Sequence, residues 1–217
     1  MREIQKKLND IDIDIILPII NVIIFIGILL PIVQFIFNRS LWTDEASLAL
    51  NILNAGYLEL LKPLDSGHGA PIIFLFLEKF FSILIPNSDY GLKIVPLLSY
   101  FASFFFFYKI LQQIFNNTYT TIFALSLFVF NATLIYYSSE VKQYMCDVFV
   151  ITSIYYIILK KYNKVQNKYY LIGIIGALSF FLSHITPIIL LSCGIYLVYV
   201  DFLNKNLKLK YIIGLVL

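Results

Sequence analysis

The ionisable side chains best placed for chemistry follow directly after the first long apolar stretch of the chain. Asp44 and Glu45 are adjacent carboxylates, and Arg39 and Trp42 lie just before them. A carboxylate held in a partly dry site beside another carboxylate has a raised pKa and can accept a proton near neutrality. A nearby cation or metal can hold an anionic phosphate leaving group. These residue types therefore suit a site that combines proton transfer with phosphate binding.

Three more polar clusters interrupt the apolar sequence. The first is Asp65 and His68 in a glycine-rich turn, and the last is His184, which stands alone. Between them lie Glu140, Lys142, Gln143, Tyr144 and Asp147. At helical spacing, Glu140, Tyr144 and Asp147 would share one face. Ionisable groups at membrane depth are functional candidates by default, so we expect all these residues to contribute to binding or catalysis.

Each cluster also has a purely structural interpretation. Asp44 and Glu45 suit the first turn of a helix, where the helix dipole favours acidic side chains. Glu140 and Lys142 could form a solvated interfacial face, while His68 and His184 could be ordinary loop or interface residues. The functional interpretation depends on all four clusters lying on one side of the membrane, which the structural interpretations do not predict.

The composition indicates a membrane protein. Of the 217 residues, 60% are hydrophobic and 13% are charged, against about 45–50% and about 25% in an average soluble domain. The mean hydropathy of +0.84 excludes both an ordinary cytosolic domain and a disordered tail. A net charge of +3 is too small and too scattered for nucleic-acid binding, so no nucleic-acid partner is expected. Two cysteines without a CxxC pattern indicate neither a disulfide framework nor a zinc site.

Apolar stretches recur along the chain at the spacing of a polytopic all-α membrane protein. The first is too long for a signal-peptide core and has no small-residue cleavage site, so it is predicted to be a retained span. The stretches cover residues 15–37, 71–85, 92–111, 121–137, 148–159, 170–183 and 187–202, with a further run from Tyr211. Because the sequence stops inside that last run, we expect the chain to be the front part of a longer protein.

Lysine placement sets the orientation, because short loops rich in Lys and Arg stay in the cytoplasm. The segments 160–168 and 205–210 are lysine-rich and should be cytoplasmic. This works only if one earlier apolar stretch does not cross the bilayer. Residues 71–85 are the candidate, because they are short and carry Glu78 and Lys79 at their centre. We predict that they lie flat or re-entrant at the outer surface.

The resulting topology has about six transmembrane helices in one module, residues 1–217. Residues 1–14 form a cytoplasmic N-terminus, and residues 38–91 and 138–147 form the first and second external loops. In the first loop, Thr43 is predicted to cap an interfacial amphipathic helix. Its polar face would hold Asp44, Ser47, Asn51 and Asn54, and its apolar face Ala46, Leu50, Leu53, Tyr57 and Leu61. Tyr90 and Lys93 are expected to be interfacial anchors without chemistry.

Several of these segments resemble motifs of the GT-C glycosyltransferases. The sequence Arg39-Ser-Leu-Trp42-Thr-Asp44-Glu45-Ala46 resembles their first-loop Asp-Glu motif, and more narrowly that of the protein O-mannosyltransferase and aminoarabinose-transferase superfamily. Residues 65–71 resemble the His-Pro-Pro-Leu region of the same loop, although only the second proline remains. Residues 136–147 resemble the second-loop signature, and residues 176–184 resemble a later segment near the lipid-phosphate site.

The resemblance implies an inverting transferase that uses a polyprenyl-phosphate sugar donor. Asp44 would be the general base that deprotonates the acceptor, and Glu45 would shape the catalytic site. The remaining candidates would bind substrate: Arg39, Trp42, Asp65, His68, Glu140, Lys142, Tyr144, Asp147 and His184. Metal dependence differs among GT-C members, so participation of a divalent cation stays open. The expected location is the bacterial cytoplasmic (inner) membrane of the cell envelope, with the site on its external face.

Other functions compatible with the sequence are a lipid or solute transporter and a structural or assembly subunit without activity. A transporter would place polar side chains along a path at the middle of the membrane. Such residues are few here, namely Asn21, Gln34, Ser99, Ser103 and Asn131. This scarcity favours the enzyme.

Overall fold

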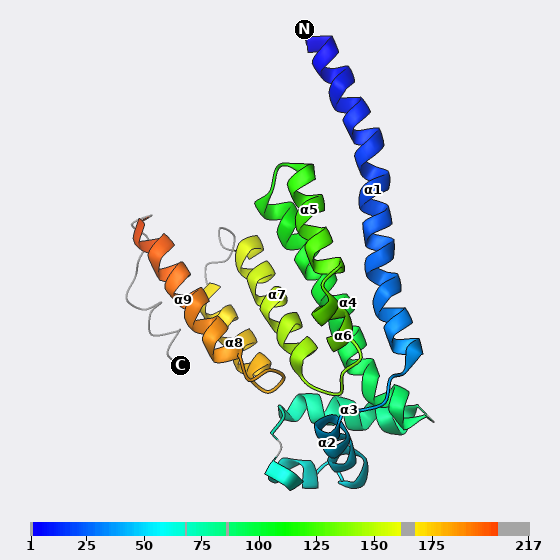
Figure 1. Cartoon of the computed structure of the whole chain (residues 1–217). Helices are drawn as coiled ribbons and strands as arrows, with labels where there is room; N and C mark the ends of the chain where they lie inside the picture. Colours follow the sequence, from blue (N-terminus) through cyan, green and yellow to red (C-terminus); the bar gives the residue numbers. More distant parts are fainter. Residues whose placement is uncertain (1, 68, 86, 162–167, 204–217) are drawn as a thin grey trace.

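The computed structural model describes residues 2–67, 69–85, 87–161 and 168–203, and within these residues it contains helices and no strand (Figure 1). The prediction of an all-α fold is therefore confirmed. The helices are α1 (Arg2–Phe37), α2 (Thr43–Asn54), α3 (Ile72–Leu84), α4 (Ser88–Ile114), α5 (Thr118–Val129), α6 (Ala132–Tyr137), α7 (Tyr144–Lys161), α8 (Lys168–Phe180) and α9 (Thr186–Leu203), with short 3-10 helices η1 (Glu59–Leu61) and η2 (Asp65–Gly67).

Three segments in the described parts of the chain are long and apolar enough to cross a membrane: Ile16–Phe37 of α1, all of α4 and all of α9. They make the chain compatible with a membrane protein. Their apolar side chains lie both inside the fold and on its surface, as expected for helices surrounded by lipid. The number of spans and the orientation stay predictions.

The long helices form a bundle that α4 organises. Helix α4 packs against α7 along its length and also contacts α1 and α5, while α8 and α9 pack against each other and against α7. Aromatic side chains fill the junction of α1, α4 and α5, where Tyr100, Phe104 and Phe128 are buried together. Glycine at position 27 lets α1 approach closely, because a Cβ there would lie 2.9 Å from Val129.

Helices α2 and α3 form a layer across one end of this bundle, below α4 and α7 in Figure 1. Helix α3 lies across the bundle axis, and its Ile73 N–H donates to the Phe181 carbonyl at 2.9 Å in the α8–α9 turn. At its other end the chain turns into α4 at Gly91, where a Cβ would lie 2.8 Å from the Phe81 carbonyl oxygen. A helix across the bundle axis is compatible with the flat arrangement predicted for residues 71–85, and its placement at the outer membrane surface stays a prediction.

A small hydrophobic core fastens this layer to the bundle. Its buried side chains come from α2, η1, α3, the start of α4, the segment before α7 and the start of α7: Leu48, Ala49, Ile52, Leu60, Phe74, Leu75, Leu92, Val95, Val141 and Cys146. Glu78 faces the same interior and is completely buried, and neither of its carboxyl oxygens has a hydrogen-bond partner. Burial raises the pKa of Glu78 well above its usual value, because an apolar interior favours the neutral form of a carboxyl group. Neighbouring Lys79 instead donates to the Leu53 carbonyl at 2.8 Å.

Three local predictions are wrong. Residues 121–137 are not one helix, because Asn131 ends α5 and caps α6 by accepting from the N–H groups of Thr133 and Leu134. Thr43 is the first residue of α2 and not its N-cap. Trp42 occupies the N-cap position, and its N–H donates a hydrogen bond to the Glu45 carboxylate.

The third concerns the faces of α2. Its buried face is Glu45, Leu48, Ala49 and Ile52, while Leu50 is 58% exposed. The apolar pattern alone pointed to Leu50, but the helix is rotated so that Glu45 faces inward. The physical reason is an ion pair that the pattern of apolar residues cannot reveal.

Candidate functional site

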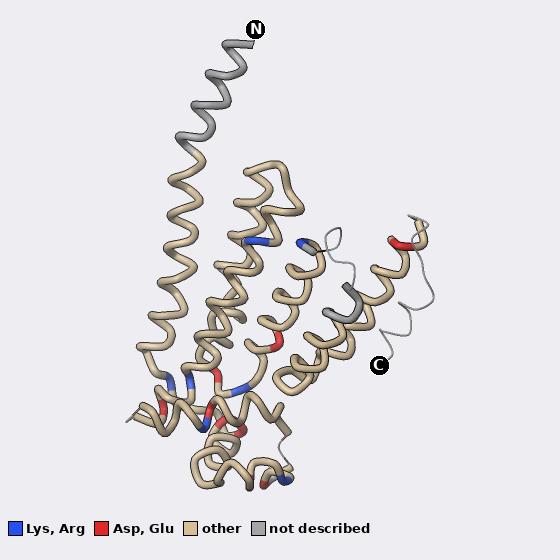
Figure 2. Tube along the Cα trace, turned by 180° about the vertical axis from the view of Figure 1, so that it is seen from behind, with Lys and Arg blue, Asp and Glu red and all other residues tan. Residues whose placement is uncertain are grey.

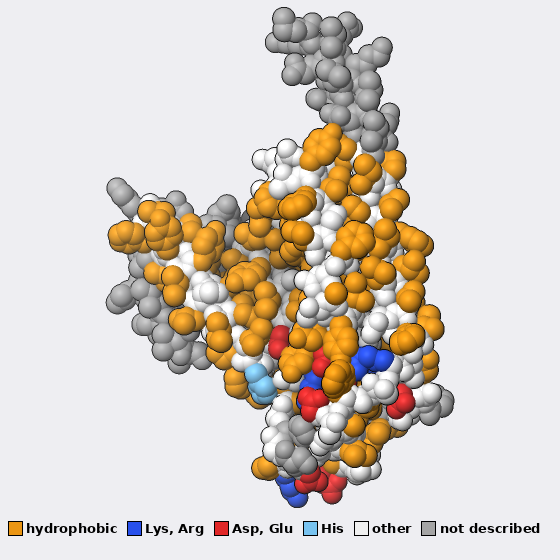
Figure 3. Space-filling view, in the orientation of Figure 1, with side chains coloured by type: hydrophobic (Ala, Val, Ile, Leu, Met, Phe, Trp, Pro, Cys, Tyr) orange, Lys and Arg blue, Asp and Glu red, His pale blue; other side chains and the backbone are white. Residues whose placement is uncertain are grey.

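Most of the charged residues in the described part of the chain gather at the end of the bundle that carries α2 and α3 (Figure 2). Figure 3 shows acidic and basic side chains together on this end, next to the apolar surface of the bundle. The end of α1, the start of α2 and the segment between α6 and α7 meet there. These are the positions of the predicted first-loop and second-loop motifs.

A bidentate ion pair between Arg39 and Glu45 forms the inside of the site. The Arg39 guanidinium donates to both Glu45 carboxylate oxygens, at 2.8 and 3.0 Å. The same carboxylate accepts the Trp42 N–H at 2.9 Å and the Val141 N–H at 2.8 Å. Glu45 is fully buried, and these four hydrogen bonds occupy the lone pairs of its carboxylate. It therefore joins the predicted first-loop and second-loop motifs across 96 positions of the sequence.

Two further contacts hold Arg39 in place. Its guanidinium carbon lies 4.2 Å from the centre of the Tyr136 ring, a cation–π contact. Its carbonyl oxygen accepts the Lys93 ammonium at 2.6 Å, and Asn38 Oδ1 accepts the same ammonium at 2.6 Å. Asn38 turns the chain out of α1 with a φ of 44°, a conformation that asparagine tolerates better than most residues.

The prediction that Lys93 is a simple interfacial anchor is therefore wrong. Lys93 is buried, and it fixes the segment that carries Arg39. Tyr136 likewise was not singled out as a site residue. The sequence contains only a weak signal for Lys93, namely a lysine on an otherwise apolar helix. A buried ammonium needs hydrogen-bond acceptors or an anion nearby, which indicates a structural role.

A second ion pair, between Lys142 and Asp44, lies at the outer edge of the site. The Lys142 ammonium lies 3.1 Å from Asp44 Oδ2. The Asp44 side chain is 59% exposed, whereas that of Lys142 is 11% exposed. The hydrogen bond from Lys142 lowers the pKa of Asp44 below its usual value. Asp44 is thus ionised, open to solvent and close to a cation. The partly dry setting with a raised pKa that the sequence suggested for this carboxylate is wrong, because Asp44 is exposed and Lys142 stabilises its charged form.

Glu140 lies between these two pairs and has an unfilled acceptor. Its side chain is 9% exposed, and its Oε2 is buried without a hydrogen-bond partner. Burial raises the pKa of Glu140 to about 7, and the nearby charge of Glu45 adds to this increase, while Arg39 and Lys142 oppose it. The predicted helical face shared by Glu140, Tyr144 and Asp147 is wrong, because α7 begins at Tyr144 and Glu140 precedes it.

Aromatic side chains border the outer pair. Tyr144 contacts Tyr137, with ring centroids 4.9 Å apart. Trp42, the single tryptophan of the chain, is 63% exposed directly before α2. Aromatic and charged groups thus lie together on a surface that an amphipathic ligand could contact.

The other predicted residues lie around this centre or apart from it. Asp147 accepts a hydrogen bond from Ser183 at 2.5 Å, and the exposed His184 follows in the turn before α9. Asp65 is not in the cluster: its N–H donates to Asn51 Oδ1 at 2.9 Å, and it lines a separate polar groove of about 650 Å³ along α2. His68 lies outside the described residues, as do segment 205–210 and the run from Tyr211.

The residues that the structure describes include no group of three or more His, Cys, Asp or Glu side chains arranged to hold a metal ion. Whether a divalent cation takes part therefore stays open. What the arrangement provides by itself is an ionised carboxylate beside an ammonium group, with a second carboxyl that can bind a hydroxyl or take a proton near neutrality.

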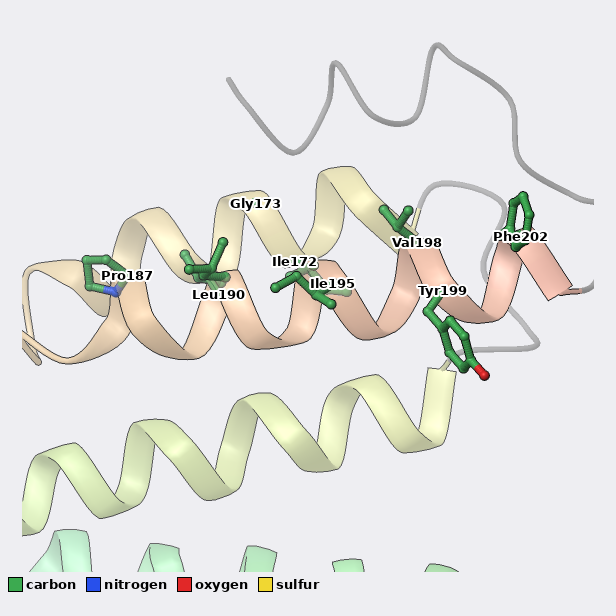
Figure 4. Close-up of a pocket in the computed structure, with 10 residues that line it drawn as sticks. Ile172, Gly173, Pro187, Leu190, Ile195, Val198, Tyr199 and Phe202 are labelled. Carbon is green, nitrogen blue, oxygen red and sulfur yellow. The ribbon is translucent and has the colours of Figure 1, made fainter.

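Two further cavities lie along the helices of the bundle, and both are lined mainly by apolar side chains. One groove of about 910 Å³ runs along α8 and α9 and is lined by Leu190, Ile195 and Phe202 among others (Figure 4). A second, of about 640 Å³, lies between α4, α7 and α9. Neither is lined by a charged side chain, so both grooves differ in character from the charged cluster at the end of the bundle.

Comparison with known proteins identifies no relative of this chain. No protein-family model, no curated protein and no solved structure matches the chain.

Proposed function

We propose that this protein is a multi-pass membrane glycosyltransferase that moves a sugar from a polyprenyl-phosphate donor to an acceptor at the external membrane face. One observation carries the proposal: two motifs far apart in the sequence form one polar site. Glu45 accepts the Val141 N–H at 2.8 Å, and Asp44 pairs with Lys142 at 3.1 Å. The rest of the topology, with about six spans in a bacterial inner membrane and a GT-C arrangement, belongs to the same proposal.

The proposed reaction is a displacement at the anomeric carbon. Asp44 takes the proton from an acceptor hydroxyl, and the acceptor oxygen forms a bond to that carbon from the face opposite the phosphate. The bond from the carbon to the phosphate oxygen breaks, and polyprenyl phosphate leaves with the electron pair. The configuration inverts. General-base catalysis of this kind contributes about 10²–10⁴-fold to a rate.

The neighbouring side chains have complementary roles. Lys142 holds the phosphate as a positive point charge, because an ammonium binds phosphate oxygens strongly. The free oxygen of Glu140 accepts a hydroxyl of the sugar or the acceptor, since a buried acceptor without a partner favours a ligand that donates to it. Arg39 and Glu45 keep both motifs in position. The sugar and the acceptor are not specified by these contacts.

The experiment is a test for donor turnover in membranes that contain the full chain. Release of free polyprenyl phosphate from a panel of polyprenyl-phosphate sugars is measured with an acceptor extract. Wild type is expected to release it, and Asp44→Asn to lose at least about 10²-fold in rate. Asp89→Asn, an exposed aspartate at the start of α4, is the matched control and should retain activity. Equal release by wild type and Asp44→Asn would contradict the role of Asp44.

A further inference from the structure

The site contains two cations close to its carboxylates, and each already has a partner. Arg39 makes two hydrogen bonds to Glu45 and stacks on Tyr136. Lys142 has its ion pair with Asp44. Arg39 Nε has no hydrogen-bond partner and the Lys142 ammonium has three N–H donors, but the charge of each cation is already shared with a carboxylate. A phosphate that enters the site therefore competes with Glu45 for Arg39 or with Asp44 for Lys142.

The two pairs differ in what opening them would cost. Separating Arg39 from Glu45 would leave a fully buried carboxylate without its cation, which is strongly unfavourable. The Asp44 side chain is 59% exposed, so water replaces Lys142 as its partner at little cost. The phosphodiester of the donor carries one negative charge on two free oxygens, as a carboxylate does, and the polyprenyl phosphate that leaves is a monoester with a charge of about −1.5 to −2, so the attraction to the cation increases during transfer. Lys142 is therefore the cation that changes partner.

We infer that an anionic phosphate group and Asp44 compete for Lys142, so that phosphate binding releases the Asp44 carboxylate into the site. This inference rests on the proposed function, because it sets the order of events at the same site. The donor binds first and takes Lys142, and Asp44 then becomes free to accept the proton. Without donor, Asp44 stays paired, which limits the contact of acceptor hydroxyls with an unpaired base.

Glu140 gives independent support for a ligand at this position. Its side chain is buried, its Oε2 lacks a partner, and it lies two residues before Lys142. Buried acceptors in folded proteins are nearly always satisfied, so an exception calls for an explanation. A ligand that carries hydroxyl donors next to its phosphate would satisfy Glu140 and Lys142 together. A sugar phosphate has this chemistry.

The test uses Trp42 as the reporter, because it is the single tryptophan and lies two residues from Asp44. The full chain is reconstituted in phosphatidylcholine nanodiscs, and its fluorescence is followed as the fraction of phosphatidic acid increases. A second arm adds inorganic phosphate to nanodiscs of phosphatidylcholine alone. The lipid arm presents the headgroup at the membrane surface, and the second arm presents it from solution.

The competition predicts changes of opposite sign in two variants. Asp44→Asn should bind phosphatidic acid roughly two- to fivefold more tightly than wild type, because Lys142 no longer has a competing carboxylate. Lys142→Gln should lose at least about tenfold in affinity, and Lys142→Arg should retain binding. Asp89→Asn removes the same charge from another exposed site and should bind as wild type does. Lys62→Gln is the corresponding control for lysine.

The outcomes separate this inference from the proposed function. Unchanged or weaker binding by Asp44→Asn would overturn the competition, even if Lys142→Gln abolishes binding. Binding of phosphatidic acid by Lys142→Gln with wild-type affinity would also overturn the competition. If inorganic phosphate changes the fluorescence and phosphatidic acid does not, the ligand is a free phosphate and not a lipid-linked donor. If Asp44→Asn binds more tightly but the wild-type chain releases no polyprenyl phosphate from any donor, the competition stands and the proposed transfer fails.

Discussion

The Arg39–Glu45 pair and the Lys142–Asp44 pair belong to one site, but their surroundings differ. We call the first the inner pair and the second the outer pair. The inner pair is bidentate and largely buried, and its carboxylate accepts backbone N–H groups from both the first-loop and the second-loop segments. The outer pair has one contact at 3.1 Å and an exposed carboxylate. The difference separates the charges that build the site from the charges that are free to change partner during a reaction.

Breaking the inner pair should have the largest effect. Glu45→Ala leaves Arg39 partly buried without its anion and leaves the Trp42 and Val141 N–H groups without their acceptor. We expect a loss of about 3–5 kcal/mol in the free energy of unfolding. Denaturant titration of the purified chain in mild detergent, followed by circular dichroism, measures it. An unfolding midpoint equal to that of wild type would show that the inner pair is not structural.

Glu78 tests whether a buried carboxyl group in this layer needs a hydrogen-bond partner. Glu78→Met removes an unpartnered carboxyl from an apolar interior, and we expect a gain of about 1–3 kcal/mol in stability. Because the pKa of Glu78 is raised in the folded chain, wild-type stability should fall as the pH rises above the usual glutamate pKa, where only the unfolded chain ionises. Glu78→Gln should lack this dependence.

Thermal unfolding of the three chains at a series of pH values between 4 and 8 measures both effects. A loss of stability in Glu78→Met would show that this carboxyl has a stabilising partner. The same pH dependence in Glu78→Gln as in wild type would show that the dependence does not come from Glu78.

Glu140 should give the outer half of the site a pH dependence. Its pKa of about 7 means that it is neutral below that pH and negative above it, where it repels an anion held by Lys142. Phosphatidic acid affinity should therefore fall by roughly threefold as the pH rises through 7. In Glu140→Gln this contribution should be absent, while the phosphate's own ionisation is common to both chains. Parallel pH profiles would contradict the role given to Glu140.

The smallest effect is expected from opening the outer pair in the absence of ligand. Asp44→Asn should not measurably change the unfolding midpoint, because the carboxylate is exposed and its ion pair is weakly stabilising. The same denaturant titration serves as the measurement. Destabilisation as large as that of Glu45→Ala would remove the distinction between the two pairs.

The sequence was sufficient for the features that depend on composition and local spacing. The all-α fold follows from the apolar composition and the lengths of the apolar stretches. The position of α3 across the bundle is compatible with the flat arrangement predicted for residues 71–85 from the cost of charge at membrane depth. The meeting of Asp44 and Glu45 with residues 140–142 was expected from their common side of the membrane, and the structure brings them together.

Features that depend on pairs of distant residues could not be predicted. The rotation of α2 follows from the burial of Glu45 by Arg39, and apolar periodicity gives a carboxylate no weight in the interior. The burial of Lys93 follows from acceptors at Asn38 and Arg39, which lie 55 and 54 positions away. The separation of Asp65 from the cluster depends on how residues 55–65 pack against α2, where the Asp65 N–H donates to Asn51, and no local motif specifies that packing.

The most direct test of the central claim is a donor titration of the transfer reaction in two variants of the full chain. The account predicts that Asp44→Asn lowers kcat by about 10²–10⁴-fold with a donor KM equal to or below that of wild type. It predicts that Lys142→Gln raises the donor KM, because the phosphate loses its cation. A wild-type kcat in Asp44→Asn, or an unchanged donor KM in Lys142→Gln, would contradict the assignment of base and phosphate-binding residue.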